Sequence, residues 1–286
     1  MATTDAAHQE AEVNDCTTGS FSLRFPRVVV GGLPVAALDR EQTARLTIRA
    51  ALARRGTRRR CLFFTTANGQ VISLAASSPA IRLLFEKADL ISADGMPVVF
   101  ASRMGPGMRL PERVATTDAF HDAAHYACQT GATFFFLGGT EEVSRRAVEA
   151  AKALYPRLRI VGYRSGYFGA DDEWAIVDEI NRAEPDVLWV GLGVPYQQLF
   201  ITRNVRRLTK VGVAKSCGGL FDFLAGKNSR APDWMQKSGM EWAYRAWQEP
   251  ARLGWRYLKT NPHAAYWLLR ARGPTSDGTI ETGAAV

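Results

Sequence analysis

Short apolar runs alternate with longer amphipathic stretches through most of the chain. The apolar runs, bounded by glycine, proline or polar residues, predict strands at 27–30, 61–65, 90–92, 133–137, 159–162, 187–192 and 211–216. The amphipathic stretches predict helices at 39–54, 79–87, 117–129, 141–154, 171–182 and 196–208. Strands that alternate with helices of this length form βαβ units. The pattern therefore predicts an α/β fold with a mostly parallel sheet and flanking helices.

Capping residues support several of these helices. Asp39 followed three residues later by Gln42 is typical of a capping box. Ser78 precedes a proline at the first helical position, and Thr140 stands where the next helix begins. These residues predict where the helices start.

The ends of the chain differ from its middle in composition. Residues 1–22 and 273–286 are small, polar and aperiodic, so we expect a disordered leader and a disordered tail. Residues 23–229 hold the predicted α/β core, and a basic helical appendage is expected over 230–272.

Composition narrows the class of protein. The chain has 286 residues, of which 47% are hydrophobic and 22% charged, as in ordinary globular proteins. It shows no secretory signal and no apolar run of the roughly 18–20 residues that a membrane span needs. The four cysteines are widely spaced, which favours a reducing cytoplasm over a disulfide framework.

A net charge of +8 indicates an anionic partner, such as nucleic acid, anionic lipid or a phosphorylated substrate. Segment 230–272 holds eight basic and three acidic residues and five of the seven tryptophans. Tryptophan prefers a membrane interface and arginine attracts anionic head groups, so one interpretation is a surface that docks on a membrane. The other is a basic helix pair that packs its aromatic face on the core.

Glycine-rich or polar segments follow five of the predicted strands. They read T-T-A-N, A-D-G, G-G-T, G-L-G-V-P-Y-Q-Q and C-G-G-L-F-D, and begin at Thr65, Ala93, Gly138, Gly191 and Cys217. Parallel sheets bind ligands beyond the carboxyl ends of their strands, where glycine lets a phosphate approach the backbone. Together these segments predict a site for a phosphorylated nucleotide.

Each candidate residue in these segments also has a plain structural interpretation. Asp94 is either a general base or the N-cap of the next helix, and Thr66 and Asn68 are either site residues or turn formers. Gln197 either reaches the same edge or lies on a helix surface.

The glycine segments are similarly ambiguous. Gly138, Gly139 and Thr140 either hold a diphosphate or form an ordinary turn. Gly191 and Gly193 are similar to the start of a dinucleotide fingerprint, but Tyr196 stands at the third glycine position, which argues against a Rossmann oxidoreductase. No D-x-D pair appears, so a metal-bridged sugar-nucleotide site is not predicted.

The order of motifs along the chain resembles the WecG/TagA/CpsF glycosyltransferases, also called family 26. The resemblance runs from about Val28 to Leu269 and is carried by T-A-N, A-D-G, P-E-R-V, F-L-G-G-T, V-G-L-G-V-P-Y-Q-Q, G-G-L-F-D-F-L-A-G, R-A-P-D-W and M-E-W-A-Y-R-A-W-Q-E-P-A-R.

The resemblance implies a Rossmann-like fold and an activity. Such enzymes are inverting and metal-independent, and they transfer a hexose from a UDP-sugar to a polyprenyl-diphosphate-linked sugar in bacterial surface-polysaccharide assembly. The hexose is of the N-acetylmannosamine type or glucose. The appendage docks on the inner face of the cytoplasmic membrane and completes the active site. No cofactor and no nucleic acid are implied, and a homo-oligomer is left open.

The resemblance also assigns residues. Asp94 becomes the base, with Thr66 and Gln197 as further catalytic residues, and Asn68 binds substrate. The remaining substrate-binding candidates come from the glycine segments and the appendage: Gly138, Gly139, Thr140, Gly193, Pro195, Asp222, Arg230, Arg245, Arg252 and Arg256.

Two positions depart from the family pattern. Gln198 stands where the family has a glutamate, and Thr116 replaces the usual glycine ahead of Asp118. Both departures concern the identity of the sugar more than the type of reaction. Two other classes of function stay open on the residues alone: another nucleotide-dependent Rossmann-type enzyme, and a non-catalytic basic module that binds a membrane.

Overall fold

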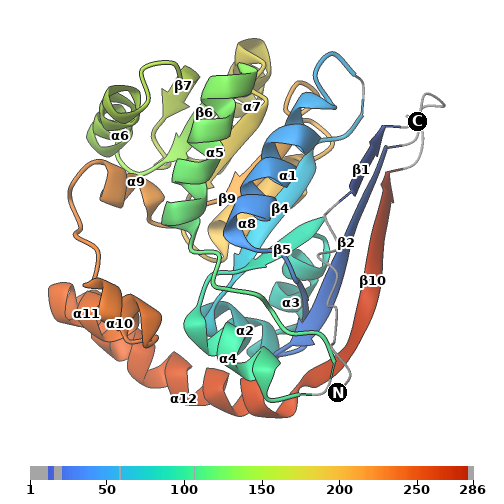
Figure 1. The fold of residues 1–286 in the computed structure, drawn as a ribbon. Coiled ribbons are helices and arrows are strands. Elements are labelled where there is room, and N and C mark those ends of the chain that lie inside the picture. Colours follow the sequence, from blue (N-terminus) through green and yellow to red (C-terminus); the bar gives the residue numbers. More distant parts are fainter. Residues whose placement is uncertain (1–11, 16–20, 58, 106, 283–286) are drawn as a thin grey trace.

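The computed structural model describes the backbone of residues 12–15, 21–57, 59–105 and 107–282 (Figure 1). Its central sheet has six strands in the order β5-β4-β9-β8-β6-β7, and every neighbouring pair is parallel. The strands are β4 (Leu62–Ala67), β5 (Leu90–Ala93), β6 (Thr133–Gly138), β7 (Arg159–Arg164), β8 (Val187–Gly191) and β9 (Val213–Ser216). The α/β prediction is confirmed.

Helices connect these strands and cover both faces of the sheet. They are α1 (Arg40–Leu52), α2 (Gly69–Ser77), α3 (Pro79–Glu86), α4 (Met96–Arg103), α5 (Thr116–Thr130), α6 (Glu141–Leu154), α7 (Glu173–Ala183), α8 (Tyr196–Asn204) and α9 (Leu220–Leu224). A 3₁₀ turn at Ala170–Asp172 leads into α7. The predicted caps are confirmed: Asp39 and Gln42 form a capping box, and the side chains of Ser78 and Thr140 accept from backbone N–H groups of α3 and α6.

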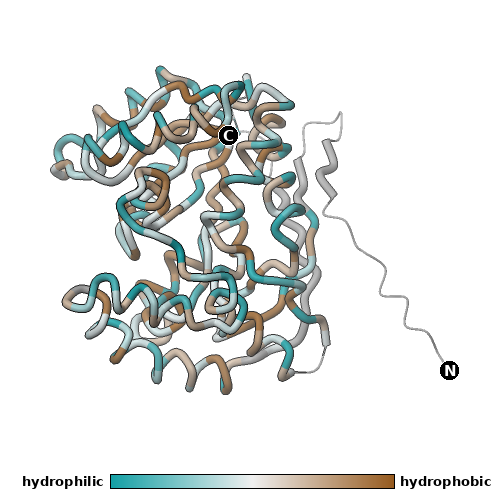
Figure 2. Tube along the Cα trace, turned by 60° about the vertical axis from the view of Figure 1, so that its left-hand side comes forward, coloured by the Kyte–Doolittle hydropathy of each residue, from teal (hydrophilic) through white to brown (hydrophobic). Residues whose placement is uncertain are grey.

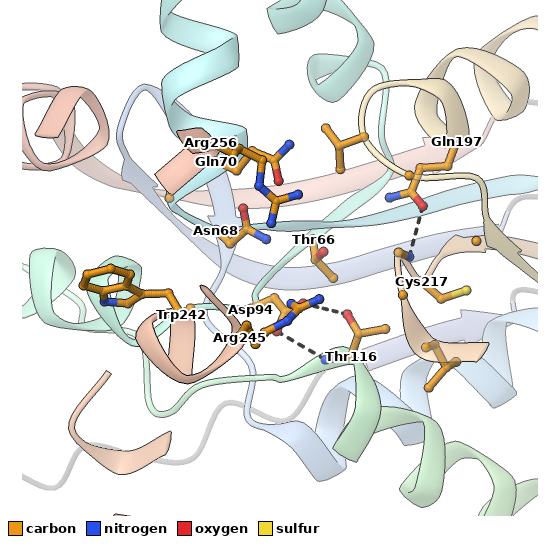
Figure 3. A pocket seen from close by; sticks show the side chains of 18 of the residues that line it. Thr66, Asn68, Gln70, Asp94, Thr116, Gln197, Cys217, Trp242, Arg245 and Arg256 are labelled. Carbon is orange, nitrogen blue, oxygen red and sulfur yellow. Dashed lines mark hydrogen bonds between the residues drawn. The ribbon is translucent and has the colours of Figure 1, made fainter. Parts of the chain in front are cut away.

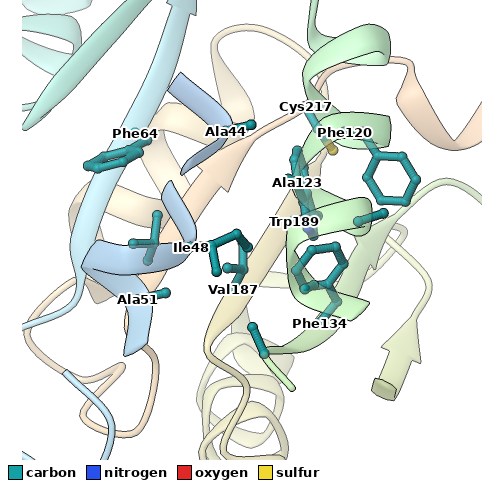
Figure 4. Close-up of a cluster of buried hydrophobic side chains, with 14 of the residues drawn as sticks. Ala44, Ile48, Ala51, Phe64, Phe120, Ala123, Phe134, Val187, Trp189 and Cys217 are labelled. Carbon is teal, nitrogen blue, oxygen red and sulfur yellow. The ribbon is translucent and has the colours of Figure 1, made fainter. Parts of the chain in front are cut away.

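Three buried clusters make up the core. Residues of α1 and α5 pack on one face of the sheet against Phe64 and Trp189 (Figure 4). On the other face, α7 and α8 pack against Phe63 and Leu188. The third cluster joins α2 and α4 to β5 and to the second sheet.

The second sheet is antiparallel and lies beside β5. It consists of β1 (Glu12–Asp15), β2 (Phe21–Val30), β3 (Leu33–Ala36) and β10 (Arg272–Thr282). The predicted strand at 27–30 belongs to this sheet and not to the parallel one. Residues 12–15, 21–22 and 273–282, which we expected to be disordered, form strands here. The reason is that β2 offers backbone groups along both of its edges, and a polar strand can pair with such an edge without burying many side chains.

Other differences concern short elements. Helices α2 and α9 and strand β3 are not among the predicted elements, and α4 is expected only as the helix that follows Asp94. Helix α8 ends at Asn204, four residues earlier than predicted. After it the chain forms a turn, in which the Asn204 carbonyl accepts from the N–H groups of Arg207 and Leu208.

The C-terminal segment is helical, as predicted. It contains α10 (Asp233–Lys237), α11 (Glu241–Gln248), a π-helical turn (Pro250–Gly254) and α12 (Trp255–Arg270). Figure 2 shows hydrophobic segments alternating with hydrophilic ones along these helices. His263 anchors α12 because its ring accepts from Trp267 and bonds to Ser73 of α2 at 2.9 Å. Among the described residues, no helix is both long and apolar enough to cross a membrane.

A buried carboxylate joins two strands at the amino edge of the sheet. Asp186 precedes β8 and accepts from the Thr133 N–H at 2.7 Å and from the Thr133 hydroxyl at 2.9 Å. It also accepts from Nε and one terminal nitrogen of the Arg55 guanidinium. Replacing it removes every one of these acceptors at once.

We therefore expect Asp186→Ala to lower the free energy of unfolding by about 3 kcal/mol, because a buried N–H and a guanidinium lose their partner. Urea unfolding measures this value. Glu142→Ala, which breaks an exposed ion pair with Arg145, is the control and should cost less than about 1 kcal/mol. Equal losses in the two variants would contradict the structural role of Asp186.

Candidate active site

A cavity of about 1450 Å³ lies at the carboxyl edge of the parallel sheet. One wall is formed by the segments that follow β4, β5, β6, β8 and β9, as predicted from the strand ends. The opposite wall is formed by α11 and α12 (Figure 3). The C-terminal helices therefore enclose the site together with the α/β core.

Asp94 lies at the edge of this cavity, directly after β5. Its carboxylate accepts from the Thr116 hydroxyl at 2.8 Å and from the Thr116 N–H at 3.3 Å (Figure 3). The N-cap of α4 is Gly95, and no side chain caps this helix, so Asp94 is not its N-cap. The side chain is held by α5 instead and is 19% exposed, which leaves it accessible from the cavity.

The charges around Asp94 act in opposite directions. Burial raises the pKa of its carboxyl above the ordinary value, and this outweighs the nearby Arg113 guanidinium and the Thr116 hydroxyl, which act to lower it. Arg113 lies 3.9 Å from Asp94 and 2.6 Å from Glu241 of α11. One cation is thus shared between the candidate base and a carboxylate of the C-terminal helices. A carboxyl with a raised pKa is a stronger base once it is ionised.

Three further candidates lie in the same cavity. Thr66 is nearly buried at the end of β4. Asn68 caps α2 by accepting from the Val71 N–H at 3.1 Å, which confirms its structural interpretation, and it also lines the cavity. Gln197 is buried and accepts from the Gly218 N–H at 3.0 Å, which fixes the loop after β9. Gln197 is therefore not an ordinary surface glutamine.

The glycine segments divide into lining and packing positions. Gly139, Thr140 and Gly193 line the cavity, whereas Gly138 and Pro195 do not. Gly138 has a φ of 149°, and a Cβ there would lie 2.4 Å from the Gly191 carbonyl oxygen. Its role in the structure is close packing between the ends of β6 and β8. Pro195, after a cis peptide bond, precedes the first turn of α8.

The predicted arginines do not share one environment. Arg245 and Arg256 line the cavity, and neither forms an ion pair with a carboxylate in the described part of the chain. Arg230 does not line it, because its guanidinium pairs with Asp118 of α5. Asp222 lines the cavity and pairs with Lys227 at 3.1 Å. The side chain of Arg252 lies outside the described part of the structure.

Arg113 and Glu241 are not among the candidates predicted from the sequence, and Thr116 enters there only as a departure from the family pattern. Arg113 and Glu241 stand inside motifs quoted above, P-E-R-V and M-E-W, so the signal was present. What the sequence lacked was the contact between residues 128 positions apart. Among the described residues, no group of three or more histidine, cysteine, aspartate or glutamate side chains is arranged to hold a metal ion.

Comparison with known proteins identifies the class. Residues 28–277 match the model of the Glycosyl transferase WecG/TagA/CpsF family, which covers most of the chain. This match makes the chain a glycosyltransferase by family. The chain belongs to the WecG/TagA/CpsF family.

Curated relatives support this assignment. An N-acetylglucosaminyldiphosphoundecaprenol N-acetyl-beta-D-mannosaminyltransferase of Bacillus spizizenii is 34% identical, over 73% of this chain and 79% of the relative. Enzymes of the same name are 32% identical in Bacillus subtilis, over 72% and 78% of the two chains, and 31% identical in Staphylococcus aureus, over 74% and 81%.

The raised pKa of Asp94 makes its charge unfavourable for folding at neutral pH. The native carboxyl binds its proton more tightly than the unfolded one, so stability falls as pH rises from the unfolded to the folded pKa. We expect Asp94→Asn to melt at a higher temperature than the wild type at neutral pH, and the difference to vanish in acid. Thermal unfolding between pH 3 and pH 8 tests this, with the exposed Asp171→Asn as control. A lower melting temperature for Asp94→Asn at pH 7 would refute it.

Proposed function

We propose that this protein transfers a hexose from a UDP-sugar to a polyprenyl-diphosphate-linked sugar, with inversion at the anomeric carbon and without a metal ion. The reaction belongs to the biosynthesis of bacterial cell-surface polysaccharide or exopolysaccharide. The observation that carries this proposal is the juxtaposition, in one cavity, of the carboxylate of Asp94 and the guanidinium groups of Arg245 and Arg256, which have no carboxylate partner among the described residues.

The arginines supply the charge that a leaving diphosphate needs. When UDP departs, negative charge develops on its β-phosphate, and cations aimed at that position stabilise the transition state. Arg113 and Arg230 already pair with carboxylates, whereas Arg245 and Arg256 have no such partner among the described residues. These two arginines are suited to replace a metal ion. The N-terminus of α6, with Gly139 and Thr140 at the cavity wall, adds backbone N–H groups for an anion.

Asp94 has the position of a general base, and burial raises the pKa of its carboxyl. The acceptor hydroxyl oxygen attacks the anomeric carbon, the bond from that carbon to the UDP oxygen breaks, and the hydroxyl proton passes to the Asp94 carboxylate. Thr116 orients the carboxylate, and the nearby Arg113 guanidinium partly compensates its negative charge. Direct displacement from the opposite side inverts the anomeric centre. Thr66 and Asn68 line the same edge and can orient the sugar.

The acceptor and the membrane are connected through the C-terminal helices. The relatives are named for an acceptor whose diphosphate carries an undecaprenol lipid, and that lipid stays in the bilayer. Trp247 and Trp255 are 78% and 63% exposed, next to basic residues of the segment that closes the cavity. This arrangement supports peripheral docking at the inner face of the cytoplasmic membrane.

The sugar is proposed from the relatives, whose names specify N-acetylmannosamine, with glucose as the other candidate. Of the two departures from the family pattern, Gln198 is fully buried, donates to the Thr65 hydroxyl at 3.1 Å and does not line the cavity. Thr116 lines it and bonds to Asp94. Thr116 is therefore the departure that bears on the reaction.

The direct test is transfer of radiolabel from a panel of UDP-hexoses to a short-chain lipid-diphosphate-sugar acceptor. We expect label to move into the lipid from one donor, at the same rate with and without EDTA, because arginines supply the positive charge. Loss of transfer on addition of EDTA would overturn metal independence. Absence of UDP binding would overturn the sugar-nucleotide assignment.

The base is tested by Asp94→Asn. We expect transfer to fall by about 10²–10⁴-fold, the usual contribution of a positioned base, while the Kd for UDP stays within about twofold. Initial rates and calorimetric titration measure the two quantities. Asp171→Asn, on an exposed turn, serves as the control and should keep full activity. Near-normal turnover by Asp94→Asn would exclude Asp94 as the base.

Membrane docking is tested with vesicles that contain anionic lipid. We expect Trp247→Ser with Trp255→Ser to weaken sedimentation with the vesicles about tenfold or more, because each ring loses its burial in the interface. Trp174→Ser replaces an equally exposed tryptophan on α7, outside the C-terminal helices, and should have no effect. Equal binding by all variants would contradict this docking surface.

A further inference from the structure

A lysine is buried in the middle of the parallel sheet. Lys215 lies on β9 with only 1% of its surface exposed, and its Nζ has no hydrogen-bond partner among the described residues. A buried ammonium without a partner is costly to the fold. Neither the family resemblance nor the reaction described above assigns a role to it.

The register shows which face of the sheet the lysine occupies. Lys215 pairs with Phe64 of β4 and with Trp189 of β8, and both belong to the cluster under α1 and α5 (Figure 4). Its neighbour Ser216 faces the other way, where its hydroxyl bonds to Thr65 at 2.8 Å. Lys215 is therefore on the α5 side of the sheet, the side from which Thr116 reaches Asp94.

Polar groups continue along this face toward the cavity. Thr66 is two residues beyond Phe64, and Ser92 pairs with Thr66 in register. The Ser92 hydroxyl is buried and, like the lysine, has no hydrogen-bond partner among the described residues. Asp94 follows two residues after Ser92. Lys215, Thr66, Ser92 and Asp94 thus lie on one face of three adjacent strands.

Among the titratable groups near Lys215, only Asp94 can supply a negative charge. The groups that act on its charge are Asp94 and Cys217, and burial keeps the Cys217 thiol neutral by raising its pKa. The helices that cover this face present apolar side chains, among them Ala44, Ile48 and Phe120. Burial lowers the pKa of Lys215 to about 8, and the attraction of Asp94 opposes that shift. The attraction of Asp94 favours the charged form of the lysine.

We propose that Lys215 is a positioning residue, whose buried ammonium favours the ionised, proton-accepting form of Asp94 from behind the cavity wall. Arg113 approaches the same carboxylate from the cavity side, but it is shared with Glu241. Lys215 has no competing carboxylate in the described part of the chain. The proposal deepens the proposed function, because it rests on Asp94 as the base.

Lys215→Met tests the proposal, since methionine keeps the length of the side chain and removes the charge. We expect the acid limb of the kcat profile to move to higher pH by about one unit, so that kcat on the rising part of the limb falls about tenfold. At pH 9 kcat should be close to that of the wild type, because Asp94 is then ionised without help. The KM for the donor should change less than about twofold at either pH.

Lys215→Arg is the matched variant that keeps the charge, and it should retain the acid limb of the wild type. An unshifted limb in Lys215→Met, or a loss that is uniform across pH, would overturn the proposal. If Lys215→Met does not fold, Lys215→Gln replaces it, with the same expected shift.

A second measurement does not depend on transfer activity. In thermal unfolding of the wild type, Lys215→Met, Asp94→Asn and the double variant, the changes in Tm at pH 7 should be non-additive by about 2–4 °C. The non-additivity should disappear at pH 3, where Asp94 is protonated. Additive changes at pH 7 would overturn the proposed electrostatic coupling between the two side chains. If coupling is seen while Asp94→Asn keeps its activity, the base assignment fails and the Lys215–Asp94 interaction stands.

Discussion

The parallel pairing of six strands is the constraint on which the site depends. Parallel neighbours must be joined by crossover connections, so every strand in this sheet ends at the same edge. The residues that follow β4, β5 and β9 are consequently brought together although they are far apart in the chain. Close packing of Gly138 against Gly191 keeps two of the strand ends adjacent. Chemistry at this edge follows from backbone geometry before any side chain is considered.

Electrostatics then differentiates the two edges of the sheet. At the amino edge, Asp89 and Asp186 are fully engaged by Arg60, Arg55 and backbone N–H groups, so their charge serves the fold. At the carboxyl edge, Asp94 is buried with incomplete compensation, and two arginines have no carboxylate partner in the described chain. Incompletely compensated charges of this kind lower the stability of the fold, and here they are concentrated at the cavity, where the charged groups of a substrate can compensate them.

The sequence predicted the parallel sheet, its longer flanking helices and the segments that line the cavity, because periodicity and capping are local signals. It placed Asp94, Thr66, Asn68 and Gln197 on the correct segments for the same reason. It did not predict the Arg113–Glu241 pair, the environment of Lys215 or the pairing of Arg230 with Asp118. These contacts depend on how distant elements pack. The same limit explains β10, whose polar sequence contains little that distinguishes a paired edge from a free tail.

The strand β10 changes the mechanics of the C-terminal helices. Because β10 pairs with β2 in the second, antiparallel sheet, the segment from α10 to α12 is attached to the core at both of its ends. A segment with two attachments is a closed loop, and its ends cannot diffuse apart. Arg245 and Arg256 are thereby kept at a high effective concentration beside the cavity, which a segment attached at only one end would not maintain. Any opening of the cavity must then occur by adjustment within this loop, and not by release of a free arm.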